Sequence, residues 1–93
     1  MREYELTIIV QADLDENAFT EVINRVAGWI TDSGGQVTKT DLWGKRQLAY
    51  PIRKQSEGYY VLMLINIDAK FGAELERNLR FLEPVLRFLL IAK

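Results

Sequence analysis

Two residue types are missing from this 93-residue sequence, histidine and cysteine. Their absence removes the commonest general base, the thiol nucleophile and the usual zinc ligands. Aspartate, glutamate, lysine, serine and tyrosine remain available for catalysis, but no paired arrangement of them points to a reaction. The sequence therefore predicts a protein that is not an enzyme and that uses no metal and no cofactor.

Long apolar runs are missing as well. No stretch approaches the roughly 18 apolar residues of a membrane-spanning helix. The first residues, Met-Arg-Glu-Tyr-Glu, lack the apolar segment of a signal peptide. Small secreted domains often carry disulfides, so the absence of cysteine favours a reducing, cytoplasmic location. We expect no membrane partner and no small-molecule substrate.

The net charge is small, at −1, but the charges are unevenly distributed along the chain. Residues 1–35 contain seven acidic and two basic side chains, whereas residues 36–93 contain six acidic and ten basic ones. The local field of a surface, rather than the total charge, decides whether it attracts a polyanion. The small total therefore does not argue against nucleic-acid binding, although solvation is the simpler role for any single cation.

The first third of the chain predicts a strand followed by a helix. Alternation along Tyr4–Val10 indicates a half-buried strand. Asp13 with Glu16 three residues later resembles a capping box and predicts where the helix begins. Gly34–Gly35 should end it, because glycine adopts the left-handed cap without steric cost. The apolar residues at helical spacing are Phe19, Val22, Ile23, Val26, Ala27 and Ile30.

The middle of the chain predicts two further strands. Val37–Tyr50 is a long extended segment in which Gly44 suggests a bulge. Pro51 has no N–H to donate, so it should lie at a strand end or on an edge strand. Lys54–Gly58 is polar and predicts a turn. Tyr59–Ile67 is the most strand-like run, and its odd-numbered residues form an unbroken apolar set that we assign to the helix side.

A second helix and a last strand complete the pattern. Asp68 is the expected N-cap, and the helix should end near Leu82, because Pro84 disfavours helical backbone at the residue before it. Val85–Ala92 is the last strand. Its inner residues are predicted to include Leu86, Phe88 and Leu90, and those of the helix are Phe71, Leu75, Leu79 and Leu82.

The order strand–helix–strand–strand–helix–strand predicts one domain over residues 1–93. Right-handed crossovers fold this order into an α+β, ferredoxin-like split βαβ sandwich (βαββαβ). It is a four-stranded antiparallel sheet with both helices on one face, so the other face is left uncovered.

Alternation along the strands predicts an apolar patch on that uncovered face. Its members come from three strands: Ile9, Tyr60, Leu62, Leu64, Leu89 and Ile91. Such a patch measures a few hundred Å², near the upper limit for a monomer, so we expect a partner protein to cover it. The alternatives are a homodimer contact and an apolar surface that stays uncovered. Bases need aromatic platforms, and Tyr60 is the only aromatic residue in the set.

Four segments of the sequence resemble the bacterial small-subunit ribosomal protein S6 family. They are Met1–Glu5, Trp43–Lys54, Gly58–Tyr60 and Val85–Arg87. The most specific piece reads Gly-Lys-Arg-x-Leu-Ala-Tyr-Pro-Ile-x-Lys, and the resemblance spans the whole chain. It implies a structural component of the small ribosomal subunit that binds 16S ribosomal RNA in the platform region. It also implies joint binding with ribosomal protein S18, which would dock on the open sheet face.

The positions of the cations predict where RNA is contacted. Arg2 begins the first strand and Lys93 follows the last, so antiparallel pairing should bring them to one corner, with Tyr4 close by. We predict that this corner touches phosphate. Arginine binds phosphate oxygens bidentately, while lysine acts as a point charge. The weaker candidates are Arg46, Arg53, Arg80 and Arg87.

A regulatory or small-ligand module on the same fold, in a homodimer, is the competing interpretation. Fold alone does not give function. Such a module would usually show a glycine-rich or aspartate-rich ligand loop, and Gly34–Gly35 is better explained as a helix cap.

Overall fold

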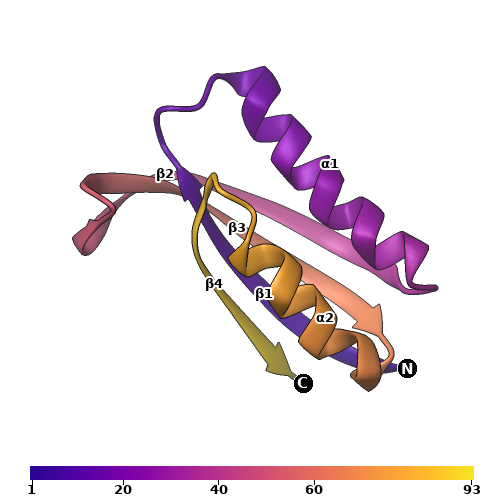
Figure 1. Ribbon diagram of the computed structural model, residues 1–93. Coiled ribbons are helices and arrows are strands. Elements are labelled where there is room, and N and C mark those ends of the chain that lie inside the picture. The colour runs from indigo at the N-terminus through magenta and orange to yellow at the C-terminus, as the bar shows by residue number, and fades with distance from the viewer.

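The computed structural model describes residues 1–93 and contains four strands and two helices. Their bounds are β1 (Arg2–Gln11), α1 (Glu16–Asp32), β2 (Gln36–Ile52), β3 (Gln55–Ile67), α2 (Ala69–Arg80) and β4 (Val85–Ala92). The strands form one antiparallel sheet in the order β2-β3-β1-β4. Both helices cover the same face of this sheet (Figure 1). The predicted ferredoxin-like α+β fold is confirmed.

The hydrophobic core lies between the sheet and the helices. The side chains at its centre come from the inward-facing positions of β1 and β3, as the alternation predicts, and from one stripe on each helix. These core residues are Leu6, Ile8, Val10, Val61, Met63, Ile65, Ile67, Val22, Val26, Ile30, Leu75 and Leu79. Leu82, in the loop after α2, and Val85, the first residue of β4, complete the same cluster.

The start of α1 differs from the prediction. Asp15, not Asp13, is the N-cap, and its carboxylate accepts a hydrogen bond of 2.8 Å from the backbone N–H of Ala18. The capping-box interpretation of Asp13 with Glu16 is therefore wrong. Ala18 occupies the position from which a Glu or Gln would return the bond, so the cap works in one direction only. The other end agrees with expectation, since Gly34 follows the C-cap with a φ of +90°.

The second helix begins as predicted and ends slightly early. The Asp68 carboxylate accepts a hydrogen bond of 3.0 Å from the N–H of Lys70. The last helical residue is Arg80, with Phe81 as its C-cap. Leu82 lies beyond the helix but remains buried against the core.

The β2–β3 turn is shorter than the sequence suggests. We expected a turn over Lys54–Gly58, but β3 already begins at Gln55, which pairs with Ile52. Only Arg53 and Lys54 connect the strands, and both have positive φ, 49° and 66°. Two-residue hairpin loops need such angles, which Asn-Gly pairs usually supply. Arg-Lys carries no such signal.

Two breaks in the regularity of β2 were predicted correctly. Gly44 has a φ of +84°, and the pairing with β3 shifts register between Leu42 and Gly44, so this is the expected bulge. Pro51 lies inside β2 rather than ending it, but β2 is an edge strand of the sheet. A proline is tolerated there because its missing N–H has no ladder partner to lose.

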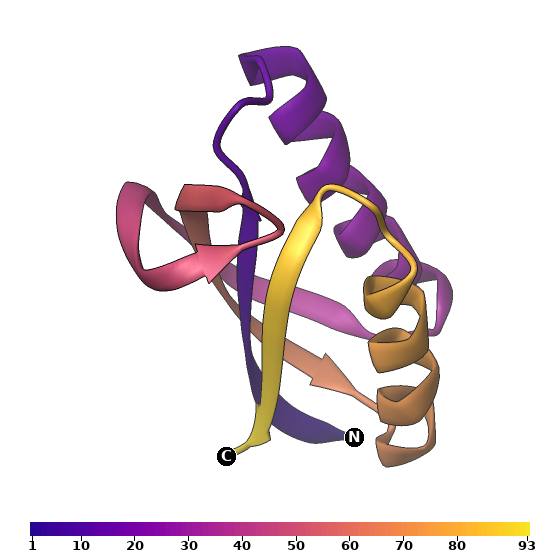
Figure 2. The same cartoon turned by 60° about the vertical axis from the view of Figure 1, so that its left-hand side comes forward.

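The tip of the β2–β3 hairpin extends past the sheet and curls over the face opposite the helices (Figure 2). Two contacts tie it to the beginning of β4. Arg53 donates a hydrogen bond of 2.8 Å to the backbone oxygen of Glu83, and Arg87 donates one to the Tyr50 hydroxyl. The chain therefore covers one end of its own open face.

Gly58 permits the hairpin to lie this close to β1. A Cβ atom at this position would lie only 2.5 Å from Cγ2 of Ile9 and 3.3 Å from the oxygen of Val10. Leu48 of β2 packs beside it and is buried. Any larger residue at position 58 would force the Ile9 side chain or the neighbouring backbone to shift.

Candidate protein and RNA interface

The open face of the sheet is an arrangement of three cross-strand rows. Residues that pair directly across antiparallel strands share a face. Read from β3 through β1 to β4, the rows are Tyr60–Ile9–Arg87, Leu62–Thr7–Leu89 and Leu64–Glu5–Ile91. Aliphatic side chains on β3 and β4 therefore flank a central strand that is polar in two rows of the three.

The structure brings all six predicted partner-face residues to this surface. Leu89 and Ile91 are the most open, with 56% and 48% of their area exposed. The three outer residues of β3 are half-buried, and so is Ile9, whose Cγ2 lies against Gly58 of β3. A shallow, mostly apolar hollow opens beside it, lined by Thr7, Ile9, Arg87, Phe88 and Leu89. The face has the shape and chemistry to receive an apolar side chain of another molecule.

The chain ends meet at one corner of the sheet, as predicted. The N–H of Lys93 donates a hydrogen bond of 2.9 Å to the oxygen of Glu3, and its Nζ lies 3.3 Å from the Glu3 carboxylate. Alternation places Arg2 on the helix side of β1, whereas Glu3 belongs to the open face. Tyr4 packs against the core. Arg2 and Lys93 are therefore close in the backbone, but the alternation puts Arg2 on the opposite face from the Lys93–Glu3 pair.

The remaining predicted cations separate into two places. Arg46 is exposed on the edge strand β2, opposite Gly58. Arg53, Arg80 and Arg87 instead line a single hollow where β4 begins. No sequence pattern predicts this convergence, because the contacts that create it join residues 30 and 37 positions apart. Local patterns report only neighbours along one element.

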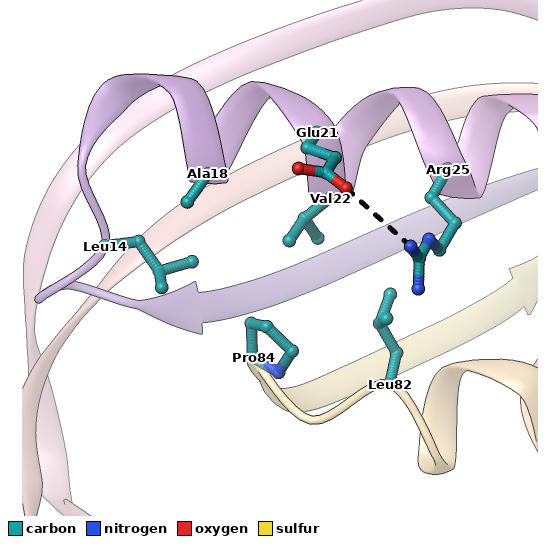
Figure 3. A pocket seen from close by; sticks show the side chains of 7 residues that line it. All are labelled: Leu14, Ala18, Glu21, Val22, Arg25, Leu82 and Pro84. Atoms are coloured by element: carbon teal, nitrogen blue, oxygen red, sulfur yellow. Dashed lines mark ion pairs between the residues drawn. The ribbon is translucent and has the colours of Figure 1, made fainter.

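A further hollow lies on the helix side, between α1 and the loop that joins α2 to β4 (Figure 3). Leu14, Val22 and Leu82 line it with apolar atoms. Its two charged residues, Glu21 and Arg25, pair with each other at 3.7 Å and are mostly exposed. Small-molecule sites need polar groups that converge on the ligand. Glu21 and Arg25 instead pair with each other, so the hollow does not have the features of such a site.

The comparisons with known proteins agree over nearly the whole chain. The family model described as ribosomal protein S6 matches residues 3–92. The chain belongs to the ribosomal protein S6 family. It is therefore a protein of the bacterial small ribosomal subunit, and its family is a structural one rather than a family of enzymes.

Individual relatives support the same assignment. The small ribosomal subunit protein bS6 of Caldanaerobacter subterraneus subsp. tengcongensis is 47% identical over 91 residues, which cover 98% of this chain and 96% of the relative. The bS6 protein of Moorella thermoacetica is 43% identical over 90 residues, covering 97% and 92%. The crystal structure of 30S ribosomal protein S6 from Thermotoga maritima superposes with a TM-score of 0.93 at 27% identity, covering 99% of this chain and 87% of that one.

Neither helix of the chain is long and apolar enough to cross a membrane.

Proposed function

We propose that this chain binds 16S ribosomal RNA in the platform region jointly with ribosomal protein S18, which docks on the open sheet face. The observation that carries the proposal is the pair of aliphatic stripes on that face, Leu62 with Leu64 and Leu89 with Ile91. The water-facing side of an antiparallel sheet normally carries polar residues. Aliphatic stripes on it are explained by a protein that covers them.

The same stripes argue against RNA as the molecule that covers the face. Single-stranded RNA stacks its bases on aromatic side chains. Leucine and isoleucine offer no π-face, but they bury well against the apolar side chains of a protein. Tyr60 is the one aromatic residue among the six predicted contact residues, and it is half-buried at the hairpin end of the face.

The charge of the chain supports joint rather than independent RNA binding. With a net charge of −1, the protein gains little affinity from counterion release by itself. A basic partner would add the missing positive charge, while cations of this chain would fix its position on the RNA. Phosphate contacts of this kind orient a protein without reading sequence. The leading contact remains the corner of Arg2 and Lys93, whose side chains leave the sheet on opposite faces and would each hold a different phosphate. The proposed location is the cytoplasm.

The experiment is a titration of a platform-region fragment of 16S ribosomal RNA with this chain alone, with S18 alone, and with both. We expect tight binding only when both proteins are present, because each supplies a part of the interface. Equal affinity for this chain alone and for the pair would contradict joint binding. A chain that forms homodimers through the open face and ignores S18 would favour the competing regulatory module.

A further inference from the structure

Three arginines from three different elements meet where β4 begins. Arg53 comes from the β2–β3 turn, Arg80 from the last turn of α2, and Arg87 from β4 itself. They line one hollow whose other walls are apolar. None of them forms an ion pair, since the three ion pairs of the chain involve other cations. The hollow therefore concentrates uncompensated positive charge.

Two of the three guanidinium groups are held in place by neutral acceptors. Arg53 donates from Nη1 to the backbone oxygen of Glu83 at 2.8 Å. Arg87 donates from Nη1 to the Tyr50 hydroxyl, and its guanidinium carbon lies 5.7 Å from the centre of the Tyr50 ring. A guanidinium has five N–H donors, so each arginine keeps most of its donors for a ligand. Neither acceptor neutralises the positive charge.

We propose that this hollow binds successive phosphodiester groups of an RNA strand and that Tyr50 is a positioning residue that holds Arg87 toward them. The ligand class rests on the proposed RNA-binding function, but the site is separate from the corner of Arg2 and Lys93. The planar fork of arginine matches phosphate oxygens. A single carboxylate would satisfy one guanidinium, whereas the successive phosphates of a polyanion can engage all three.

The folding of the hairpin over the open face explains how Tyr50 acts. Tyr50 lies on β2, the strand farthest from β4 in the sheet order. Only the curled tip brings its ring and hydroxyl to Arg87. Fixing a long side chain before the ligand arrives removes part of the entropy cost of binding. The contact therefore preorganises Arg87 without changing the charge of the site.

The first test uses the isolated chain, with NMR signals of the arginine Nε–Hε groups and a short single-stranded oligoribonucleotide at low salt. We expect the signals of Arg53, Arg80 and Arg87 to shift along one saturable curve. The signal of Arg77, which is also in the last turn of α2 but outside the hollow, should not shift. The absence of shifts, or equal shifts at every arginine, would overturn the proposal. Saturation by inorganic phosphate at the same concentration would show that the site takes a free anion and not RNA.

The second test compares charge-matched variants of the protein–S18 pair on the RNA fragment. Arg80→Gln should lower the salt slope of binding by about 1, as the loss of one phosphate contact does. Arg77→Gln, on the same helix turn, should leave the slope unchanged. Equal slopes for the two variants would contradict the site. If the pair fails to bind the RNA at all, the proposed function fails, while the titration of the isolated chain still reports on the hollow.

Tyr50→Phe tests the positioning role. It keeps the ring and the net charge but removes the acceptor for Arg87. We expect an unchanged circular dichroism melt, a moved Arg87 Nε signal in the free protein, and severalfold weaker oligoribonucleotide binding at Arg87. If Tyr50 had a purely structural role, the melting temperature would change and the oligoribonucleotide titration curve of the Arg87 signal would stay the same. An Arg87 curve identical to that of the unmodified protein would show that Tyr50 does not position it.

Discussion

The two faces of the sheet use the same strands, yet they differ in what covers them. On the helix side, Leu6 and Ile8 of β1 are completely buried. On the other side, Glu5 and Thr7 of the same strand lie between half-exposed aliphatic residues, and only the hairpin tip covers one end. The helix side therefore contains the core of the fold, whereas the open face is the surface that we propose for binding.

This difference follows from the length of the strands as well as from their alternation. β2 and β3 are long enough to extend past the sheet and curl back, but their tip reaches only the beginning of β4. Leu89 and Ile91, nearer the chain end, remain exposed. The chain thus covers the row that contains Ile9 and leaves the other two rows uncovered.

The largest expected effect is on stability, at the helix side. Ile30→Ala should lower the free energy of unfolding by about 2–5 kcal/mol, because it leaves a cavity in a fully buried site. Leu89→Ala, the matched truncation on the open face, should change it by no more than about 0.5 kcal/mol. Chemical denaturation of both variants gives the two values. Similar losses for both would mean that the open face also carries the fold.

The next effect concerns the proposed binding of S18 to the open face. Leu62→Asp should leave the fold intact and weaken binding at least about a hundredfold, because a carboxylate buried without a partner is costly. Asp41 lies opposite Leu62, so Leu62→Asn serves as the control without charge repulsion. Circular dichroism and a binding titration are the measurements. If Leu62→Asp unfolds the chain, Leu89→Asp at a more exposed position decides the question, and normal S18 binding by it would refute the assignment.

A smaller effect is expected for RNA at the chain-end corner. The double variant Arg2→Gln with Lys93→Gln should reduce the salt slope of RNA binding by the protein–S18 pair by about 2, one for each lost phosphate contact. Binding to S18 without RNA should stay the same. An unchanged slope would show that this corner does not touch the RNA.

The smallest effect concerns the acid that pairs with Lys93. Glu3→Gln removes the carboxylate 3.3 Å from Nζ of Lys93. Exposed pairs contribute only about 0.2–1 kcal/mol, so freeing Lys93 should tighten RNA binding by no more than roughly fivefold. Filter binding at low salt can resolve this change. Weaker binding in the variant would mean that the pair itself orients Lys93 for the RNA.

Much of this architecture could be predicted from alternation and helical spacing, because each reports which side of one element is apolar. The inward residues of β1 and β3, the stripe on α1, and the bulge at Gly44 were all predicted in this way. The predicted N-cap, Asp13, lies two residues before the observed one, Asp15, because an aspartate is an equally good capping residue at either position. The extended backbone at Asp15 and the hydrogen bond that its carboxylate accepts from Ala18 identify it as the cap.

The candidate RNA site was less accessible to sequence reasoning. Alternation predicted which residues lie on the open face, but it did not predict the conformation of the hairpin tip. Arg53 and Lys54 adopt positive φ there, and neither is the glycine that would have indicated such a turn. The contact between Tyr50 and Arg87 depends on this tip. A prediction made element by element has no means of placing residues from the turn, α2 and β4 in one hollow.

The claim that the two faces divide stability from binding can be tested directly by methyl NMR of the labelled chain during a titration with S18. We expect the methyl signals of Leu62, Leu64, Leu89 and Ile91 to shift or broaden, while those of Val26 and Ile30 on the helix side remain in place. Changes confined to the methyl groups of α1 and α2, with the open-face signals unmoved, would contradict it.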